Sequence, residues 1–177
     1  MRTLTEQLAN YAAYHRDRRN IATHFVGIPM IVFAVCVLLA RPAFALPGTS
    51  LVIHPAWVIG AAAALFYLRL SLGYGLAMTA LLIVSLLAAS RVAEASTAAW
   101  LATGVGLFVV GWIVQFVGHY YEGRKPAFVD DLIGLLIGPL FVVAETAFAL
   151  GASRELKRAI EAQVGPTLIR RRGAQAA

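Results

Sequence analysis

The sequence predicts an all-α membrane protein, a multi-pass transmembrane helical bundle with an amphipathic helix at its N-terminus. Of its 177 residues, 60% are hydrophobic and only 14% are charged, and the mean hydropathy is +0.75. A soluble domain of this size carries about 25% charged residues. The apolar residues gather into long uncharged runs, which a small soluble core cannot bury. Composition and patterning therefore exclude a soluble globular enzyme and a disordered chain.

The N-terminal residues predict an amphipathic helix over 3–19, within an interfacial segment 1–20. Thr3 and Glu6 have the spacing of a capping box, in which each side chain satisfies a backbone donor of the first turn. No apolar run precedes this polar segment, so it does not resemble a cleaved signal peptide. The residues that follow at helical spacing on one face are Leu4, Leu8, Tyr11 and His15.

Long apolar segments then predict the membrane helices, each of which needs about 20 residues for a full crossing. Pro42, Pro47, Gly48 and Pro55 mark residues 41–55 as a loop. The second and third segments are short and are separated by a turn at residues 69–73. The five segments are 24–40, 56–71, 73–90, 98–118 and 131–150.

The distribution of Lys and Arg predicts the topology, because cytoplasmic loops carry an excess of basic residues. If the last apolar segment does not cross, only Arg41 and Arg91 of the 15 basic residues lie outside. We therefore expect four crossings and a broken, re-entrant fifth segment that bends near Gly138-Pro139, where proline interrupts the helical hydrogen bonds. A kinked fifth span is the alternative.

This topology places both termini on the cytoplasmic side, of the inner membrane if the source is bacterial. Residues 1–150 are predicted to form a single membrane-embedded catalytic domain, and 151–177 a basic cytoplasmic tail. The formal charge of +6 sits beside the apolar runs, with no aromatic residues interleaved as a single-strand binder needs. Anionic lipid headgroups explain the charge, so membrane lipids are expected as partners and nucleic acid is not.

The same topology gathers His15, His24 and His119 at the cytoplasmic face and places His54 on the opposite side. His15 and His24 are nine residues apart, about 180° around a continuous helix. They can face one ion only if the chain breaks between them. The stretch Arg18-Arg19-Asn20 offers such a break, with Asn20 as the predicted N-cap of the first membrane helix.

Further polar residues accompany the histidines in or beside the membrane. Gln115, His119 and Glu122 are spaced to share one helical face, and Glu145 lies deep in an apolar run. Ionisable groups in a membrane are functional candidates, and imidazoles with a carboxylate suit Zn, Fe, Cu or Ni. The alternatives are a hydrogen-bonded headgroup neighbour for each histidine and ion pairing for Glu122 or Glu145. The candidate catalytic residues are Glu122, Glu145, Asn20 and Gln115.

Three sequence patterns resemble the membrane 2-hydroxy fatty acid dioxygenases over about residues 4–150. The first is Tyr14-His15-x4-Asn20-x3-His24-x2-Gly27-x-Pro29, the second Trp112-x2-Gln115-Phe116-x-Gly118-His119-x2-Glu122-x3-Pro126-Ala127, and the third Gly138-Pro139-x5-Glu145. The resemblance implies an Fe(II)-dependent α-oxidation that shortens a 2-hydroxy fatty acid by one carbon. It also implies that His15, His24 and His119 are iron ligands. The basic run 16–19 departs from the family pattern.

The residues themselves are compatible with this chemistry. A 2-hydroxy acid chelates iron through its hydroxyl and carboxylate where histidines leave adjacent positions open for it and for O2. Arginine suits a bidentate grip on the carboxylate, and the candidates are Arg16, Arg18, Arg19 and Lys125. Two other functions stay open. One is a zinc-dependent membrane lipid hydrolase with Glu122 or Glu145 as general base, and the other is a non-enzymatic scaffold or transporter subunit.

Overall fold

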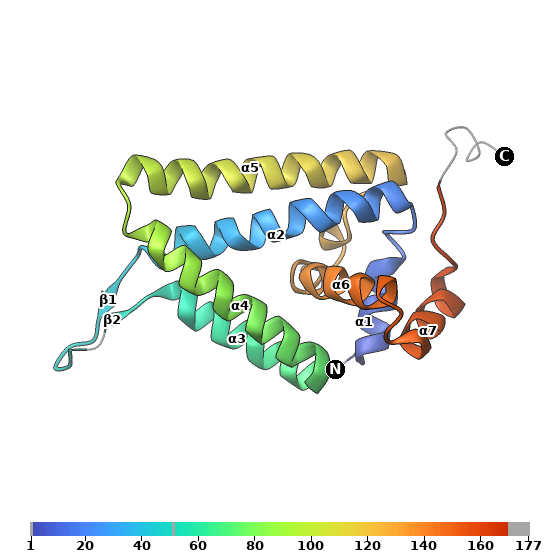
Figure 1. The fold of residues 1–177 in the computed structure, drawn as a ribbon, viewed down its shortest axis with the longest axis horizontal. Helices are drawn as coiled ribbons and strands as arrows, with labels where there is room; N and C mark the ends of the chain where they lie inside the picture. Colours follow the sequence, from blue (N-terminus) through green and yellow to red (C-terminus); the bar gives the residue numbers. More distant parts are fainter. Residues whose placement is uncertain (1, 51, 170–177) are drawn as a thin grey trace. The chain divides into compact units, whose positions relative to one another are not determined.

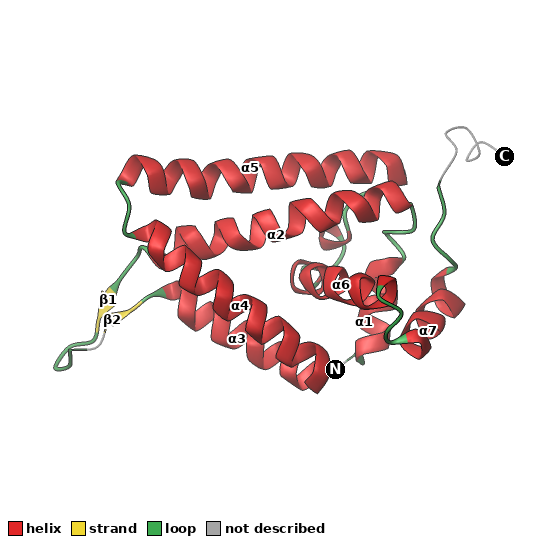
Figure 2. Cartoon of the chain, in the orientation of Figure 1, coloured by secondary structure: helices red, strands yellow, loops and turns green. Residues whose placement is uncertain are grey.

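The computed structural model describes residues 2–50 and 52–169, and these are mostly helical (Figures 1 and 2). The five predicted apolar segments are all found as helices. A short antiparallel hairpin, with two residues in each strand, lies within the predicted loop 41–55. In chain order the elements are α1 (Leu4–Ala12), α2 (Arg18–Ala40), β1 (Phe44–Ala45), β2 (Val52–Ile53), α3 (Pro55–Leu70), α4 (Leu72–Ala93), α5 (Thr97–Glu122), the 3-10 turn η1 (Ala127–Val129), α6 (Gly134–Ala149) and α7 (Arg154–Val164).

Three of these helices, α2, α4 and α5, are long and apolar enough to cross a membrane. The bent pair α6–α7 would add a fourth span if it counts as one. Large apolar side chains such as Val109 and Ile113 stay exposed along α5, at 49% and 56%. Exposed apolar surface of this kind suits contact with lipid. These helices support the membrane character of the chain. The number of times that the chain crosses the membrane, expected to be four, stays a prediction.

The described residues group into two compact units. Unit 1 contains those of 1–28 and 113–177, and unit 2 contains 29–112. Within unit 2, α3 and α4 pack side by side as a hairpin that turns at Ser71 (Figure 1). A Cβ on Gly75 would lie 2.5 Å from the Leu68 Cα, so glycine is required for this close approach. The Trp100 indole donates to the Val37 carbonyl oxygen at 2.8 Å and joins α5 to α2.

Within unit 1, α1 packs against α6 and α7. The predicted capping box is present, because Thr3 and Glu6 exchange their side-chain and backbone hydrogen bonds. The helix ends at Ala12, however, rather than at residue 19. Residues 13–17 form a connector between α1 and α2, which begins at Arg18.

Two predicted breaks lie elsewhere. Asn20 is not an N-cap, because the Asp17 carboxylate caps α2 by accepting the Arg19 N–H at 2.8 Å. The prediction of a bend near Gly138-Pro139 is also wrong, since α6 runs unbroken through both residues. Pro139 lies only in the second turn of α6, where a missing N–H removes one helical hydrogen bond near the helix start.

The sharp bend instead separates α6 from α7, at 116°. Gly151 and Ser153 have φ values of 79° and 51° there, and two residues in the left-handed region reverse the helical course. The predicted basic tail 151–177 thus contains a helix that packs on α1. Whether α6 spans or re-enters the membrane stays a prediction.

Candidate metal centre

The connector between α1 and α2 turns His15 back onto His24. Both imidazoles are buried, and their Nε2 atoms lie 2.9 Å apart. The nine-residue spacing, which would put them on opposite sides of a continuous helix, is thus overcome by the break at residues 13–17. For imidazole nitrogens about 2.1 Å from one ion, neighbouring ligand atoms lie about 3 Å apart. The observed separation fits that requirement.

Backbone carbonyls determine which nitrogen of each ring carries the proton. His15 Nδ1 donates to the Tyr11 carbonyl oxygen at 2.7 Å, and His24 Nδ1 donates to that of Asn20 at 2.8 Å. A carbonyl accepts only, so each neutral ring keeps its Nε2 lone pair free. Two lone pairs facing each other repel, whereas a cation between them is bound by both. Hydrogen bonds of this kind orient metal-binding histidines in proteins.

His119, in the last turn of α5, completes the cluster. Its ring centroid lies 5.0 Å from that of His15 and 5.1 Å from that of His24. Its Nδ1 is buried and has no hydrogen-bond partner among the described residues. The ligand atoms of the three histidines all lie within 4.8 Å of one another. A buried, neutral three-nitrogen donor set suits Fe, Zn, Cu or Ni.

Aromatic rings wall the cluster on one side. The Tyr11 ring stacks on His15 with centroids 4.1 Å apart and planes within 7°, and the Phe141 ring lies 5.6 Å from His15. Burial lowers the pKa of His15 well below its usual value, and neighbouring His24 adds to this. The ring therefore stays neutral, as a ligand must. Sequence reasoning missed both aromatic residues as part of the site, although Tyr11 precedes His15 by one helical turn.

Glu122 holds the connector to the end of α5. Its buried Oε2 accepts the backbone N–H groups of Arg16 and Asp17 at 3.0 and 2.8 Å, and the side-chain amide of Asn20 at 3.1 Å. Glu122 thereby links the residues that follow His15 to the helix that carries His119. A Cβ on Gly118 would collide with Asn20 and Thr23, so glycine lets α5 approach α2 closely here.

Three further residues considered in the sequence are not among the converging ligands. Gln115 is buried on α5, and its Oε1 has no hydrogen-bond partner in the part of the chain that the structure describes. Glu145 is half-buried on α6 and is not one of the residues whose ligand atoms converge. His54 is not one of the residues whose ligand atoms converge, and it hydrogen-bonds the Pro42 carbonyl oxygen at 3.0 Å.

Three of the four candidate carboxylate-binding residues, Arg16, Arg19 and Lys125, differ in their partners. Arg19 pairs with the buried Asp17 at 2.7 Å, and Lys125 pairs with Asp130 at 2.5 Å. Arg16 is buried and donates only to backbone carbonyl oxygens among the described residues. Burial lowers the pKa of its guanidinium, against the opposing charges of Glu145 and Glu122. Arg16 is thus a buried cation with no ion pair in the described residues.

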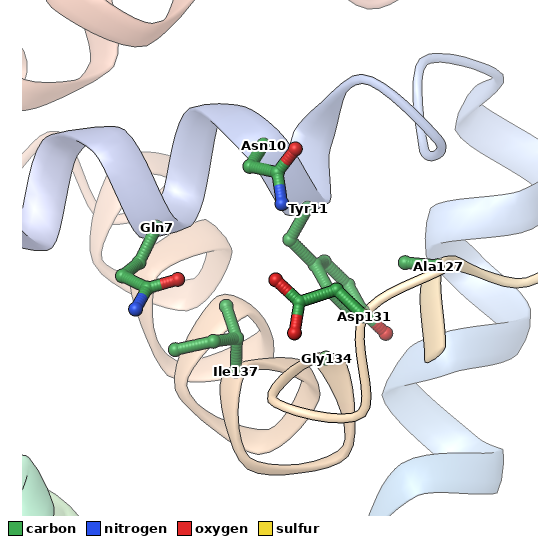
Figure 3. A pocket seen from close by; sticks show the side chains of 7 residues that line it. All are labelled: Gln7, Asn10, Tyr11, Ala127, Asp131, Gly134 and Ile137. Atoms are coloured by element: carbon green, nitrogen blue, oxygen red, sulfur yellow. The ribbon is translucent and has the colours of Figure 1, made fainter. Parts of the chain in front are cut away.

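A small cavity is lined in part by Tyr11, the residue that stacks on His15 (Figure 3). Its volume is about 10 Å³, which is about the minimum for one water molecule. It is too small for a fatty acid, so it is not the substrate site. The residues that line it are Gln7, Asn10, Tyr11, Ala127, Asp131, Gly134 and Ile137.

Comparison with known proteins identifies the family. A protein-family model described as 2-hydroxy-palmitic acid dioxygenase Mpo1-like matches residues 1–150. The 2-hydroxy-palmitic acid dioxygenase MPO1 of Saccharomyces cerevisiae is 33% identical over 160 residues, which cover 89% of this chain and 87% of the yeast protein. No solved structure matches the chain. The resemblance seen in the sequence motifs is therefore confirmed, and the chain belongs to the Mpo1-like family.

Proposed function

We propose that the protein is an Fe(II)-dependent dioxygenase that converts a 2-hydroxy fatty acid to the fatty acid one carbon shorter. The observation that carries the proposal is the buried cluster of His15, His24 and His119, with two of its rings fixed by backbone carbonyls. The relative from yeast bears the name of a 2-hydroxy-palmitic acid dioxygenase. The overall conversion uses one O2 per 2-hydroxy acid and yields the shorter acid, CO2 and water, so it balances without an external reductant.

The residues of this chain divide the work. The three neutral histidines would hold the ion through one nitrogen each, and a set of three protein ligands would leave coordination positions open for substrate and O2. Iron(II), when bound, supplies the one-electron chemistry with O2 that amino-acid side chains lack. Tyr11 and Phe141 keep water from one side of the cluster. Gln115 Oε1, buried and unpartnered among the described atoms, is suited to accept the hydrogen bond of a substrate hydroxyl.

Arg16 is our candidate for holding the substrate carboxylate. Arg19 and Lys125 already form ion pairs, with Asp17 and Asp130, whereas the guanidinium of Arg16 is buried without one. A buried cation gains most from an anionic ligand, because water does not screen the attraction there. Membrane lipids would surround the acyl tail, with the reacting end at headgroup depth on the cytoplasmic side.

Replacing Arg16 with glutamine is expected to raise the KM for 2-hydroxypalmitate roughly ten- to hundredfold. A hydrogen bond to a charged group contributes about 1.5–3 kcal/mol, and Arg16→Gln removes the charge. Initial rates over a range of substrate concentrations measure the effect, with iron content determined on the same samples. Lys125→Gln is the matched control and should leave KM within about twofold, since Lys125 is an exposed, paired cation. A fall in iron content with unchanged KM would contradict the carboxylate role and assign Arg16 to structure alone.

The proposed function itself is tested with the full-length protein, purified without oxygen and without chelators. We expect about one equivalent of iron per chain and oxygen uptake on addition of 2-hydroxypalmitate, in a ratio of about one O2 per pentadecanoate formed. Removal of iron with a chelator should stop the uptake, and added Fe(II) should restore it. Stoichiometric zinc without oxygen uptake would instead support the hydrolase, and the absence of any bound metal would support a scaffold.

A further inference from the structure

The last described residues of the chain run alongside the connector that carries His15. The Arg18 N–H donates to the Leu168 carbonyl oxygen at 2.9 Å, and the Leu168 N–H donates to the Arg16 carbonyl oxygen at 2.9 Å. These two bonds form a parallel β-bridge between Asp17 and Leu168. We call residues 165–168 the C-terminal strap. It attaches to the connector within three residues of His15.

A side chain reinforces the same attachment. The Arg16 guanidinium donates from Nη1 to the Gly165 carbonyl oxygen at 2.9 Å, while its Nε donates to the Ala12 carbonyl oxygen at 2.8 Å. The strap is therefore held by backbone and side-chain bonds of Arg16, in the connector, and by the backbone N–H of Arg18, the first residue of α2. Arg16 in turn joins the strap to the end of α1.

The strap also completes the N-terminus of α2. The first four N–H groups of a helix have no partner within the helix and need one elsewhere. The Asp17 carboxylate accepts the backbone N–H of Arg19, and the Leu168 carbonyl oxygen accepts the backbone N–H of Arg18. His24 lies in the second turn of α2, so the start of this helix sets its position. The strap thus borders both chain segments that bring His15 and His24 together.

Helix α7 delivers the strap to this place. It packs on α1, with Ile160 only 3% exposed, and ends at Val164, directly before the strap. Both α7 and the strap lie beyond residues 1–150, the part that matches the family model. The packing of α7 on α1 and the bonds of the strap to the connector are therefore a property of this chain that the family match does not describe.

We propose that the C-terminal strap is a positioning element of the metal centre, which holds the connector in the conformation that sets His15 against His24. The role of the strap in metal binding rests on the proposed function, whereas its hold on the connector stands on the hydrogen bonds alone. Without the strap, the Arg16 carbonyl and the Arg18 N–H lose their partners, and the connector gains freedom to move His15 away from His24.

The test compares two shortened chains, one ending at Val164 and a matched control ending at Ile169, which keeps the strap. Fe(II) affinity, measured anaerobically by competition with a chromogenic chelator, should fall tenfold or more in the shorter chain and stay at the full-length value in the control. Hydrogen–deuterium exchange of the peptide that covers residues 14–20 should be faster in the shorter chain alone. Equal Fe(II) affinity or equal exchange in the two chains would overturn the proposal.

A second pair of variants tests the strap if the shorter chain fails to fold. In the full-length protein, Leu168→Pro removes the N–H that bonds to the Arg16 carbonyl, whereas Leu168→Ala keeps it. We expect faster exchange at residues 14–20 and weaker Fe(II) binding for the proline variant only. Identical behaviour of the two variants would refute the proposed role of the strap. If the full-length protein binds no Fe(II), the proposed function fails, and the exchange measurement still decides whether the strap holds the connector.

Discussion

Replacing His119 with alanine is expected to abolish the conversion of 2-hydroxypalmitate and to remove the bound iron, with the yield of folded protein retained. His119 supplies one of three converging nitrogens, and its Nδ1 has no hydrogen bond among the described residues that its loss would break. Partners that merely orient a metal ligand cost about 10–100-fold in metal affinity or activity when removed. Loss of a ligand should cost at least as much, so we expect a fall of 100-fold or more in the rate of pentadecanoate formation.

His54→Ala is the matched control, because His54 is half-buried and is not one of the histidines whose ligand atoms converge. Its activity and iron content should equal those of the unaltered protein. Iron content by elemental analysis, oxygen uptake and product formation are measured on the same preparations. Unchanged activity of the His119 variant at normal yield would defeat the ligand assignment and, with it, the proposed use of the cluster.

The second large effect is expected at Glu122. Glu122→Ala leaves three donors near the connector without their acceptor, those of Arg16, Asp17 and Asn20. A buried donor left without an acceptor costs about 1–3 kcal/mol, so three of them correspond to a fall of roughly 10 °C or more in the melting temperature of a protein of this size. Iron affinity should fall as well, since the connector that carries His15 is no longer held to α5.

The same measurements separate this positioning role from a general base. If Glu122 holds the connector, Glu122→Gln should show intermediate losses of thermal stability and of iron affinity, because an amide oxygen still accepts hydrogen bonds but without the charge. If Glu122 is a base, the glutamine variant should lose kcat alone, with melting temperature and iron content unchanged. Glu94→Ala is the control, since Glu94 forms only an exposed pair with Arg91, and its melting temperature should stay within about 2 °C.

The sequence was sufficient to predict the helical segments and the meeting of the histidines. Apolar runs reveal membrane helices because the bilayer allows few alternatives to a helix. Counting crossings placed His15, His24 and His119 on one face, and the nine-residue spacing required a chain break between the first two. The break exists, but three to five residues earlier than predicted, because Asp17 rather than Asn20 caps α2. Asp17 and Asn20 are both residues that commonly cap helices, so the local sequence does not decide which of them begins α2. Tertiary contacts decide it.

Other features depend on contacts that no local pattern reveals. A proline inside a helix predicts a bend, but the effect of a proline depends on how far it lies from the start of the helix. Pro139 is only five residues after Gly134, the first residue of α6, and the helix runs through it without a break. The hold of Glu122 on the connector joins residues more than 100 positions apart in the chain. The pairing of Asp17 with Leu168 uses backbone atoms, which every residue possesses and which leave no signal in the sequence.

The division of the chain into two units means that the metal centre joins residues that are far apart in the sequence. Unit 1 is assembled from the two ends of the chain, and all of unit 2 lies between His24 and His119. An ion bound by these histidines therefore closes a long loop in the folded chain. Because loop-closure entropy grows only logarithmically, doubling the intervening length would cost about 0.6 kcal/mol. The number of residues between His24 and His119 therefore has only a small effect on the entropy of closing the centre.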